Sequence, residues 1–265
     1  MGKREVRMLL VATIVVLSFI WVLERGREGE VRVTFCDVGQ GDGAIIRQGD
    51  WEMLIDVGAD NGEMLRCLSR ELPFWDKKIE LIVLTHEDAD HIGALGSVGK
   101  YYEVEKIMGV EGGSEQINYT GYLRSFDVIR YGKIDFEILW PEKGVEVGEV
   151  ENEESLVGIL RVEGESILFT GDAPVEVEQY LVWREILNEK VTYLKVSHHG
   201  SKTGTSEELL EIIEPEVAIV SVGKNSYGHP SEEVISRLSN KKIDIWKTEN
   251  MGDIKLTLGK GKNIP

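Results

Sequence analysis

The sequence predicts an α/β (α+β) domain in which two β-sheets pack together and helices cover their outer faces. Segments with strand character outnumber helical ones, and the helical segments fall into two groups. The polar motifs follow strand-like segments, so they are expected at one edge of the paired sheets. No Pro/Ser-rich linker interrupts residues 31–265, and the apolar fraction of 42% is ordinary for a globular protein. Residues 28–265 are therefore predicted to form one domain.

The first 27 residues have a different character. Lys3, Arg4 and Arg7 precede Met8–Leu23, a run of 16 residues without a charge. This pattern predicts an N-terminal hydrophobic helix that serves as a signal peptide or a membrane anchor. A retained anchor is favoured because no small-residue cleavage site follows the run, and the basic flank would leave the N-terminus inside and the domain outside. A buried N-terminal helix is the alternative.

In the first half of the domain, apolar and polar residues alternate over 31–38, which predicts a strand that runs into a glycine-rich turn. A hairpin is expected next, and then an amphipathic helix that ends before Pro73. A continuous apolar run then predicts a buried strand. The corresponding ranges are 44–47 and 52–57 for the hairpin, 64–72 for the helix and 79–85 for the buried strand.

The second half of the domain repeats the mixture of strands and helices. Strands are expected at 126–131, 133–139, 155–162, 166–169, 191–196 and 217–222, with two more within 243–258. Helices are expected at 175–187, 206–213 and 231–238, the last with Ser231 as its N-cap. On this reading each half of the domain could supply one sheet.

Cys36 and Cys67 are the only cysteines, and their spacing matches no zinc motif. A domain outside the cytoplasm could join them in a disulfide, and two unpaired core thiols are the alternative.

All five histidines fall within three short motifs. His86 and His91 flank Asp88 and Asp90, His198 and His199 precede Gly200, and His229 precedes Pro230. Imidazole and carboxylate are the ligands that divalent cations take in hydrolytic sites. The clustering therefore predicts a metal-dependent hydrolase.

Asp172 follows a second predicted strand, and His198 follows a third. Three strand ends that meet at one edge would form a pocket for one or two divalent cations. Asp172 could bridge two cations because a carboxylate has two oxygens. Such a pair would activate a water molecule for attack on phosphorus and neutralise charge on a phosphodiester.

These motifs together resemble the metallo-β-lactamase superfamily, and within it the C-terminal nuclease domain of ComEC-type competence proteins. The matching segments are 37–42, 54–58, 84–93, 170–172, 194–201 and 227–230. The resemblance implies an αββα sandwich with metal ions at one edge.

The resemblance also implies roles for individual residues. His86 and Asp88 would hold one metal ion, Asp90, His91 and His198 the other, and Asp172 both. The catalytic residues would be Asp90, His199 and His229. The substrate-binding residues would be Asn152, Ser155, Ser201, Asp37, Gln40 and Asp42.

Several of these roles have alternatives. Neighbouring residues at a strand end point in opposite directions, so one of His198 and His199 should bind metal and the other face substrate, with His198 favoured as the ligand. His229 could instead shape a turn with Pro230, and the residues of 37–42 could only shape their glycine turn. Asp56 could orient a ligand histidine or cap its strand.

The composition of the ligand set bears on the metal. Asp88 stands where the wider superfamily has a histidine, and no histidine lies between His91 and His198. One site would therefore be rich in oxygen ligands, which suit Mn²⁺ or Mg²⁺ better than Zn²⁺. The expected cofactor is one or two divalent ions, Mn²⁺ or Zn²⁺, with Mg²⁺ as an alternative.

The chain has a formal net charge of -17. This charge disfavours tight non-specific coating of DNA, but bound cations would reverse the field at the site. The predicted function is an extracytoplasmic phosphodiesterase or nuclease acting on DNA. A metallo-hydrolase of a small ester, lactone or cyclic nucleotide is the second hypothesis, and a surface binding module the third. Expected partners are DNA or another phosphodiester, the membrane, and a separate channel protein, because one apolar segment cannot form a pore.

Overall fold

The computed structural model describes residues 29–144 and 152–261, together with Glu5, Arg7, Leu10 and residues 12–15 near the N-terminus. The predicted hydrophobic helix within residues 1–27 therefore lies largely outside the described residues. In the part that is described, none of the helices has both the length and the apolar character needed to cross a membrane.

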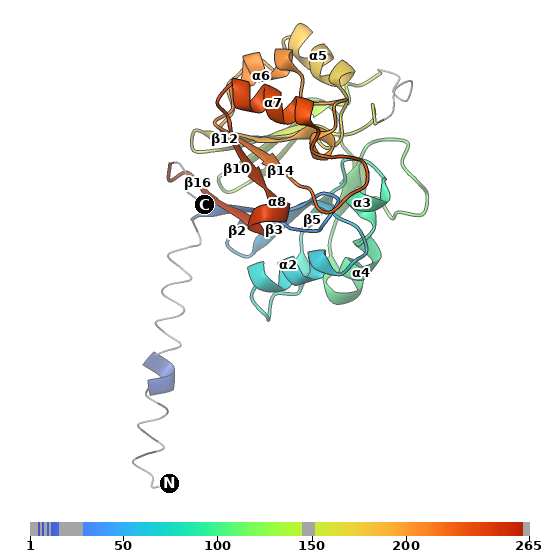
Figure 1. The fold of residues 1–265 in the computed structure, drawn as a ribbon. Coiled ribbons are helices and arrows are strands. Elements are labelled where there is room, and N and C mark those ends of the chain that lie inside the picture. Colours follow the sequence, from blue (N-terminus) through green and yellow to red (C-terminus); the bar gives the residue numbers. More distant parts are fainter. Residues whose placement is uncertain are drawn as a thin grey trace.

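Two seven-stranded sheets form the centre of the domain (Figure 1). The first sheet has the order β16-β1-β2-β3-β5-β7-β8 and is mixed: β16 to β3 pair antiparallel, and β3 to β8 pair parallel. Its strands are β1 (Val31–Phe35), β2 (Gly43–Gln48), β3 (Trp51–Val57), β5 (Leu81–Val83), β7 (Ile107–Gly109), β8 (Gly121–Tyr122) and β16 (Ile254–Leu258). Strands β4 (Lys78–Ile79) and β6 (Glu103–Val104) form a separate two-stranded parallel sheet.

The second sheet has the order β15-β14-β13-β12-β11-β10-β9. Strands β9 to β12 pair antiparallel, and β12 to β15 pair parallel. The strands are β9 (Val128–Tyr131), β10 (Ile134–Trp140), β11 (Val157–Val162), β12 (Glu165–Phe169), β13 (Tyr193–Lys195), β14 (Val217–Val220) and β15 (Asp244–Lys247). Because β12, β13 and β14 run parallel, the residues that follow them leave the sheet at one edge.

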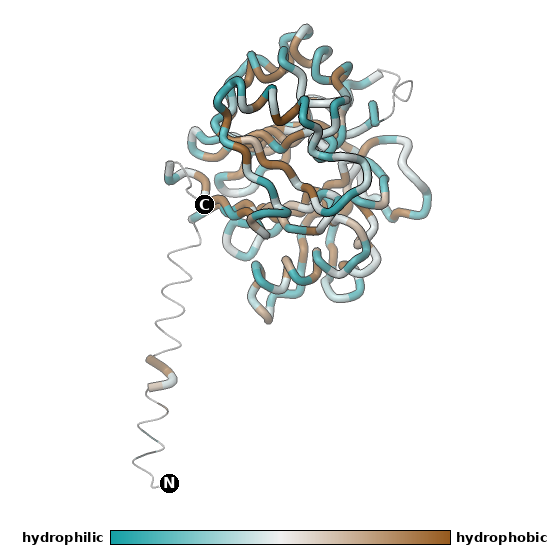
Figure 2. The backbone as a smooth tube through the Cα atoms, viewed as in Figure 1, coloured by the Kyte–Doolittle hydropathy of each residue, from teal (hydrophilic) through white to brown (hydrophobic). Residues whose placement is uncertain are grey.

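Helices cover both outer faces (Figure 1). Apolar residues of α5 (Val175–Trp183), α6 (Glu207–Ile213) and α7 (Glu232–Asn240) join the core on the outer side of the second sheet. Those of α2 (Glu63–Glu71) and α4 (Leu95–Tyr101) pack on the first sheet. A third core, which includes Phe35, Phe136 and Phe169, lies between the sheets. Figure 2 shows the apolar residues concentrated along the strands and the hydrophilic ones on the outer turns. The predicted architecture, two packed sheets with helices on both outer faces, is confirmed.

Local sequence signals account for the helix ends. Ser231 accepts a hydrogen bond from the backbone amide of Val234, so it is the N-cap of α7 as predicted. Ser206 caps α6 in the same way through the amide of Leu209. The helix expected over 175–187 ends earlier, at Trp183, because residues 184–187 turn back toward the core.

The C-terminal tail contains the two strands expected within 243–258, and they do not pair with each other. The short helix α8 (Thr248–Met251) separates β15 from β16, and these two strands belong to different sheets. Strand β16 crosses to the first sheet and pairs with β1 along its whole length. The first half of the domain therefore does not complete its own sheet; the end of the chain supplies the last strand.

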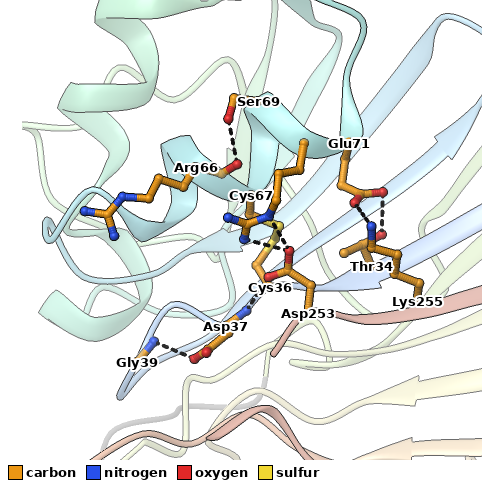
Figure 3. The surroundings of a disulfide bond; sticks show 11 residues. Thr34, Cys36, Asp37, Gly39, Arg66, Cys67, Ser69, Glu71, Asp253 and Lys255 are labelled. Carbon is orange, nitrogen blue, oxygen red and sulfur yellow. Dashed lines mark hydrogen bonds and ion pairs between the residues drawn. A yellow bond between two sulfur atoms is a disulfide. The ribbon is translucent and has the colours of Figure 1, made fainter. Parts of the chain in front are cut away.

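Cys36 and Cys67 form a disulfide that joins the end of β1 to α2 (Figure 3). Both residues are fully buried. Asp253 lies beside the disulfide, accepting hydrogen bonds from the backbone amide of Asp37 at 3.0 Å and from Arg70 at 2.8 Å. Disulfides of this kind persist in oxidising compartments, so the bond indicates a domain that folds outside the cytoplasm.

Removing the disulfide should destabilise the domain. The two cysteines are 31 residues apart, and a loop of that length predicts a loss of about 3 to 4 kcal/mol in the free energy of unfolding. We expect this loss for Cys36→Ala/Cys67→Ala in urea titrations. Reducing the unchanged protein with dithiothreitol provides a control without new cavities. Equal stability of the oxidised and reduced protein would contradict the expectation.

Candidate metal centre

The first group of candidate ligands lies directly after β5. Thr85 and His86 leave the sheet, and the short helix α3 (Ala89–Ile92) follows. His86 and His91 are buried, the Asp90 side chain is 35% exposed, and the Asp88 side chain is 62% exposed. His86 Nε2 lies 3.6 Å from an Asp88 carboxylate oxygen. The tight turn thus points two buried imidazoles inward and leaves Asp88 at the surface.

Asp172 lies where these histidines meet. It follows β12 through Thr170 and Gly171, and its carboxylate is buried. One carboxylate oxygen is 3.2 Å from Nε2 of His91. The other oxygen faces the Nε2 atoms of three further histidines: His86 at 3.9 Å, His198 at 3.6 Å and His199 at 3.7 Å. Burial favours a neutral carboxyl, but His91 and His199 hold the pKa of Asp172 well below its ordinary value. Asp172 is therefore a charged group shared by four imidazoles.

His198 and His199 diverge because both have left-handed backbone conformations, with φ of 47° and 55°. Their rings are inclined by 79° to each other. His199 is buried, with Nε2 at 3.2 Å from Asp90. The His198 side chain is 26% exposed, and its ring faces that of His229, with 5.4 Å between centroids.

Hydrogen-bond partners behind the rings fix the tautomers of two histidines. His91 Nδ1 lies 2.8 Å from an oxygen of Asp56, and His199 Nδ1 lies 2.9 Å from the carbonyl of Ser221. These oxygens can only accept, so each Nδ1 carries a proton, and Nε2 is the ring nitrogen that each histidine directs to the centre, where it could bind a metal ion. Asp56 also accepts hydrogen bonds from the amide and hydroxyl of Thr85. Both alternatives for Asp56 are thus realised: it orients a histidine and secures the end of a strand.

The donors fit a divalent cation. Nε2 of His86, Nε2 of His91 and one oxygen of Asp172 are buried without a hydrogen-bond partner in the described part of the protein. Such atoms are costly to bury unless something else binds them. Among the described residues, four sets of side chains have their ligand atoms within 4.8 Å of one another. Two of them are His86, His91 and Asp172, and Asp90, His91 and His199; the other two include Asp42. Imidazole nitrogens and carboxylate oxygens in this arrangement form a site for divalent metal.

The glycine-rich turn before β2 packs on the backbone of this site. Gly41 has φ of +134°, and a Cβ there would lie 2.2 Å from the carbonyl oxygen of Asp90. The same carbonyl accepts a hydrogen bond from the amide of Asp42 at 3.1 Å. Only glycine fits this contact. The turn therefore packs directly against the backbone of α3 and helps to hold it in place.

A buried ion pair beneath the centre has no counterpart among the sequence predictions. Lys195, the last residue of β13, places Nζ 2.6 Å from an oxygen of Asp42. The other Asp42 oxygen is 3.4 Å from His199 Nδ1. Burial disfavours the Asp42 charge, but Lys195 and His199 hold its pKa far below the ordinary value. The available signal was a lysine inside an otherwise apolar strand, a position where lysine is rarely buried unpaired.

The six residues predicted to contact substrate occupy different places. Gln40 lines the cleft over the metal ligands, while Asn152 and Ser201 line a neighbouring cleft. Asp42 is buried in the ion pair, and Asp37 accepts a hydrogen bond from the amide of Gly39 in its own turn.

Ser155 is fully buried behind Asp172, whose amide donates to the Ser155 hydroxyl at 2.9 Å. His229 lines both clefts. Its backbone amide donates a hydrogen bond to the Asn225 side chain, so it also belongs to a loop that Asn225 holds.

Fold and site together define a metallo-β-lactamase-fold hydrolase with a buried histidine and aspartate metal centre. The metallo-beta-lactamase superfamily profile matches residues 36–224, which is most of the domain. The chain belongs to the metallo-β-lactamase superfamily.

The chain is also similar to longer proteins that are named for competence and recombination. The chain is 31% identical to ComE operon protein 3 of Bacillus subtilis, over 95% of this chain and 36% of the relative. It is 29% identical to competence protein ComA of Neisseria gonorrhoeae, over 88% of this chain and 33% of the relative. For recombination protein 2 of Haemophilus influenzae the identity is 30%, over 85% and 28%. The chain thus spans about a third of the length of each relative.

Solved structures support the fold independently. The metallo-beta-lactamase fold protein YhfI from Bacillus subtilis superposes with a TM-score of 0.59 at 12% identity, covering 86% of this chain and 99% of that one. Zn²⁺-bound PqqB from Methylobacterium extorquens gives 0.55 at 10% identity, covering 83% and 88%.

Proposed function

We propose that the domain is a metal-dependent phosphodiesterase that cleaves DNA outside the cytoplasm. The observation that carries the proposal is the set of buried, unpartnered imidazole and carboxylate atoms around Asp172, at the base of an open cleft of about 680 Å³. A cleft of this size could admit a nucleotide unit of a strand. Similarity to competence proteins supports DNA as the substrate, and the disulfide supports a location outside the cytoplasm.

The distances in the centre support the following ligand roles. His86 and Asp88 would hold one ion, Asp90 and His91 the other, and Asp172 would contact both. For the remaining ligand we propose His199, because it is buried against Asp90, whereas His198 is partly exposed and faces His229. Bound cations would activate water and offset charge on the phosphodiester. His198 and His229 would then contact the scissile phosphate or the leaving oxygen.

The N-terminal segment bears on where the enzyme acts. We propose that residues 1–27 anchor the domain to the membrane or direct its export, and that residues 28–265 form the hydrolase. A channel protein is the proposed partner if the activity accompanies DNA transport.

A nuclease assay tests the proposal. Purified full-length protein would be incubated with single- and double-stranded DNA and Mn²⁺, Mg²⁺ or Zn²⁺. We expect Mn²⁺-dependent cleavage that Asp90→Ala abolishes, because Asp90 contributes an oxygen to the proposed second site. Activity with Zn²⁺ alone would contradict the oxygen-rich assignment.

Two outcomes of the same assay would replace the proposal. The net charge of -17 favours a small substrate over a polyanion. Hydrolysis of a small ester or cyclic nucleotide without DNA cleavage would establish that alternative. Absence of turnover on every substrate, with metal bound, would indicate a binding module.

A further inference from the structure

Tyr227 stands on a ridge between two clefts, and the residue is 75% exposed. The cleft over the metal ligands and a second cleft of about 670 Å³ share three lining residues, His198, Tyr227 and His229. The Tyr227 ring stacks against that of His229, with 5.8 Å between centroids and 28° between planes. The outer side of the tyrosine ring is therefore available at the entrance to the metal centre.

The loop that carries Tyr227 is held firmly by one side chain. The Asn225 carbonyl oxygen accepts hydrogen bonds from the backbone amides of Tyr227, Gly228 and His229, at 3.0 to 3.1 Å. Its amide group donates to the carbonyls of Gly223 and His229. This bonding orders the loop before anything binds, so a ligand that stacks on Tyr227 would lose little conformational entropy.

Each cleft also has a lysine on its wall. Lys224 lines the cleft over the metal ligands, and Lys202 lines the second. Neither lysine has an ion-pair partner within 4.0 Å among residues 29–144 and 152–261, although the chain carries an excess of acidic residues. The two ammonium groups therefore offer positions for anions on either side of the ridge.

We infer that Tyr227 is a base-stacking residue: a single nucleic acid strand crosses the ridge with one nucleobase on the tyrosine ring and a phosphate in each cleft. The inference rests on the proposed function and deepens it by naming a nucleotide subsite. The scissile phosphate lies in the cleft with the metal ligands, and the neighbouring phosphate lies beside Lys202. A π-face is common to all four bases, so this subsite selects a strand without selecting a sequence.

Binding measurements test the subsite without requiring cleavage. We would use the full chain carrying Asp90→Ala with Mn²⁺, and a fluorescent oligothymidylate of about 12 nucleotides. One abasic site would be moved along the strand, and the dissociation constant would be measured by anisotropy for each position.

With Tyr227 present, we expect one position at which removing the base weakens binding by roughly 5- to 100-fold. In Tyr227→Ala, binding of the intact strand should weaken by a similar factor. The scan of abasic positions should become flat, which means that the dissociation constant no longer depends on the position of the abasic site. Tyr227→Phe should restore the position-dependent loss, because it keeps the ring. Lys202→Gln and Lys224→Gln should each reduce the salt slope by about 0.7 without flattening the scan.

Three results would overturn the inference: a flat scan with Tyr227 present, a Tyr227→Ala scan that keeps its position dependence, or Tyr227→Phe that behaves like Tyr227→Ala. These outcomes are distinct from failure of the proposed function. Nuclease activity with a flat scan would refute stacking alone, whereas a position-dependent scan in a protein that cleaves no DNA would refute the nuclease and leave the subsite intact.

Discussion

Asp172→Asn is expected to lower metal-dependent hydrolysis by at least about 1,000-fold, the equivalent of about 4 kcal/mol in transition-state stabilisation. Asp172 has the most contacts of any carboxylate in the centre, lying within 3.9 Å of four histidines. Asparagine has the same shape but no charge, so it should remove the shared anionic ligand with little change in packing. The expected loss of hydrolysis would therefore result from removal of the Asp172 carboxylate as a metal ligand and not from a change in the fold.

Measurements of metal content show whether the loss of activity in Asp172→Asn comes from loss of a metal ligand. After dialysis against Mn²⁺, elemental analysis should find less than the wild-type metal content in Asp172→Asn, and added Mn²⁺ should no longer raise its melting temperature. Asp60→Asn is a matched control because Asp60 lines the same cleft, while its carboxylate bonds to Ser97 and belongs to none of the ligand sets. Full metal content in Asp172→Asn would show that the centre has been misassigned.

The sequence predicted the parts of this centre that lie close together in the chain. The His86 to His91 motif and the Thr170 to Asp172 turn each follow a strongly apolar strand, β5 of the first sheet and β12 of the second, and the packing of the two sheets brings the two motifs into contact. Residue type and local spacing were sufficient there. The N-cap of α7 could be identified for the same reason, since capping depends on neighbours within one helical turn.

What the sequence left open depends on backbone conformation or on distant contacts. The expectation that one of His198 and His199 binds metal, with His198 favoured, assumed the alternation of an extended strand, which does not hold where both residues have positive φ. The Cys36–Cys67 bond required the distance between two elements, which no spacing provides. The assignment of β16 to the first sheet is likewise a long-range pairing, between residues more than 200 positions apart.

Lys195→Met is expected to produce the largest loss of stability among single substitutions near the centre. Lys195 and Asp42 form a pair at 2.6 Å with side chains only 4% and 8% exposed. Removing one partner leaves the other as an uncompensated buried charge, which typically costs about 3 to 5 kcal/mol. Urea unfolding of the metal-free protein should show a decrease of this size in the free energy of unfolding.

A surface pair provides the comparison. Lys190 and Glu214 are also 2.6 Å apart, but their side chains are 72% and 57% exposed. Lys190→Met should therefore change the free energy of unfolding by no more than about 1 kcal/mol. Since the distance and the residue lost are the same, the difference between the two variants measures the effect of burial.

The double substitution Asp42→Leu/Lys195→Met determines what the pair contributes. Replacing both partners by apolar residues leaves no unpaired charge, so most of the stability lost in Lys195→Met should return. Metal affinity should not return with it, because Asp42 also lies 3.4 Å from Nδ1 of His199, which we assign to the centre. Recovery of stability without recovery of Mn²⁺ binding would mean that the ion pair is needed for metal binding and that two apolar residues can replace it in stabilising the fold. Recovery of both would mean that Lys195 and Asp42 are structural alone.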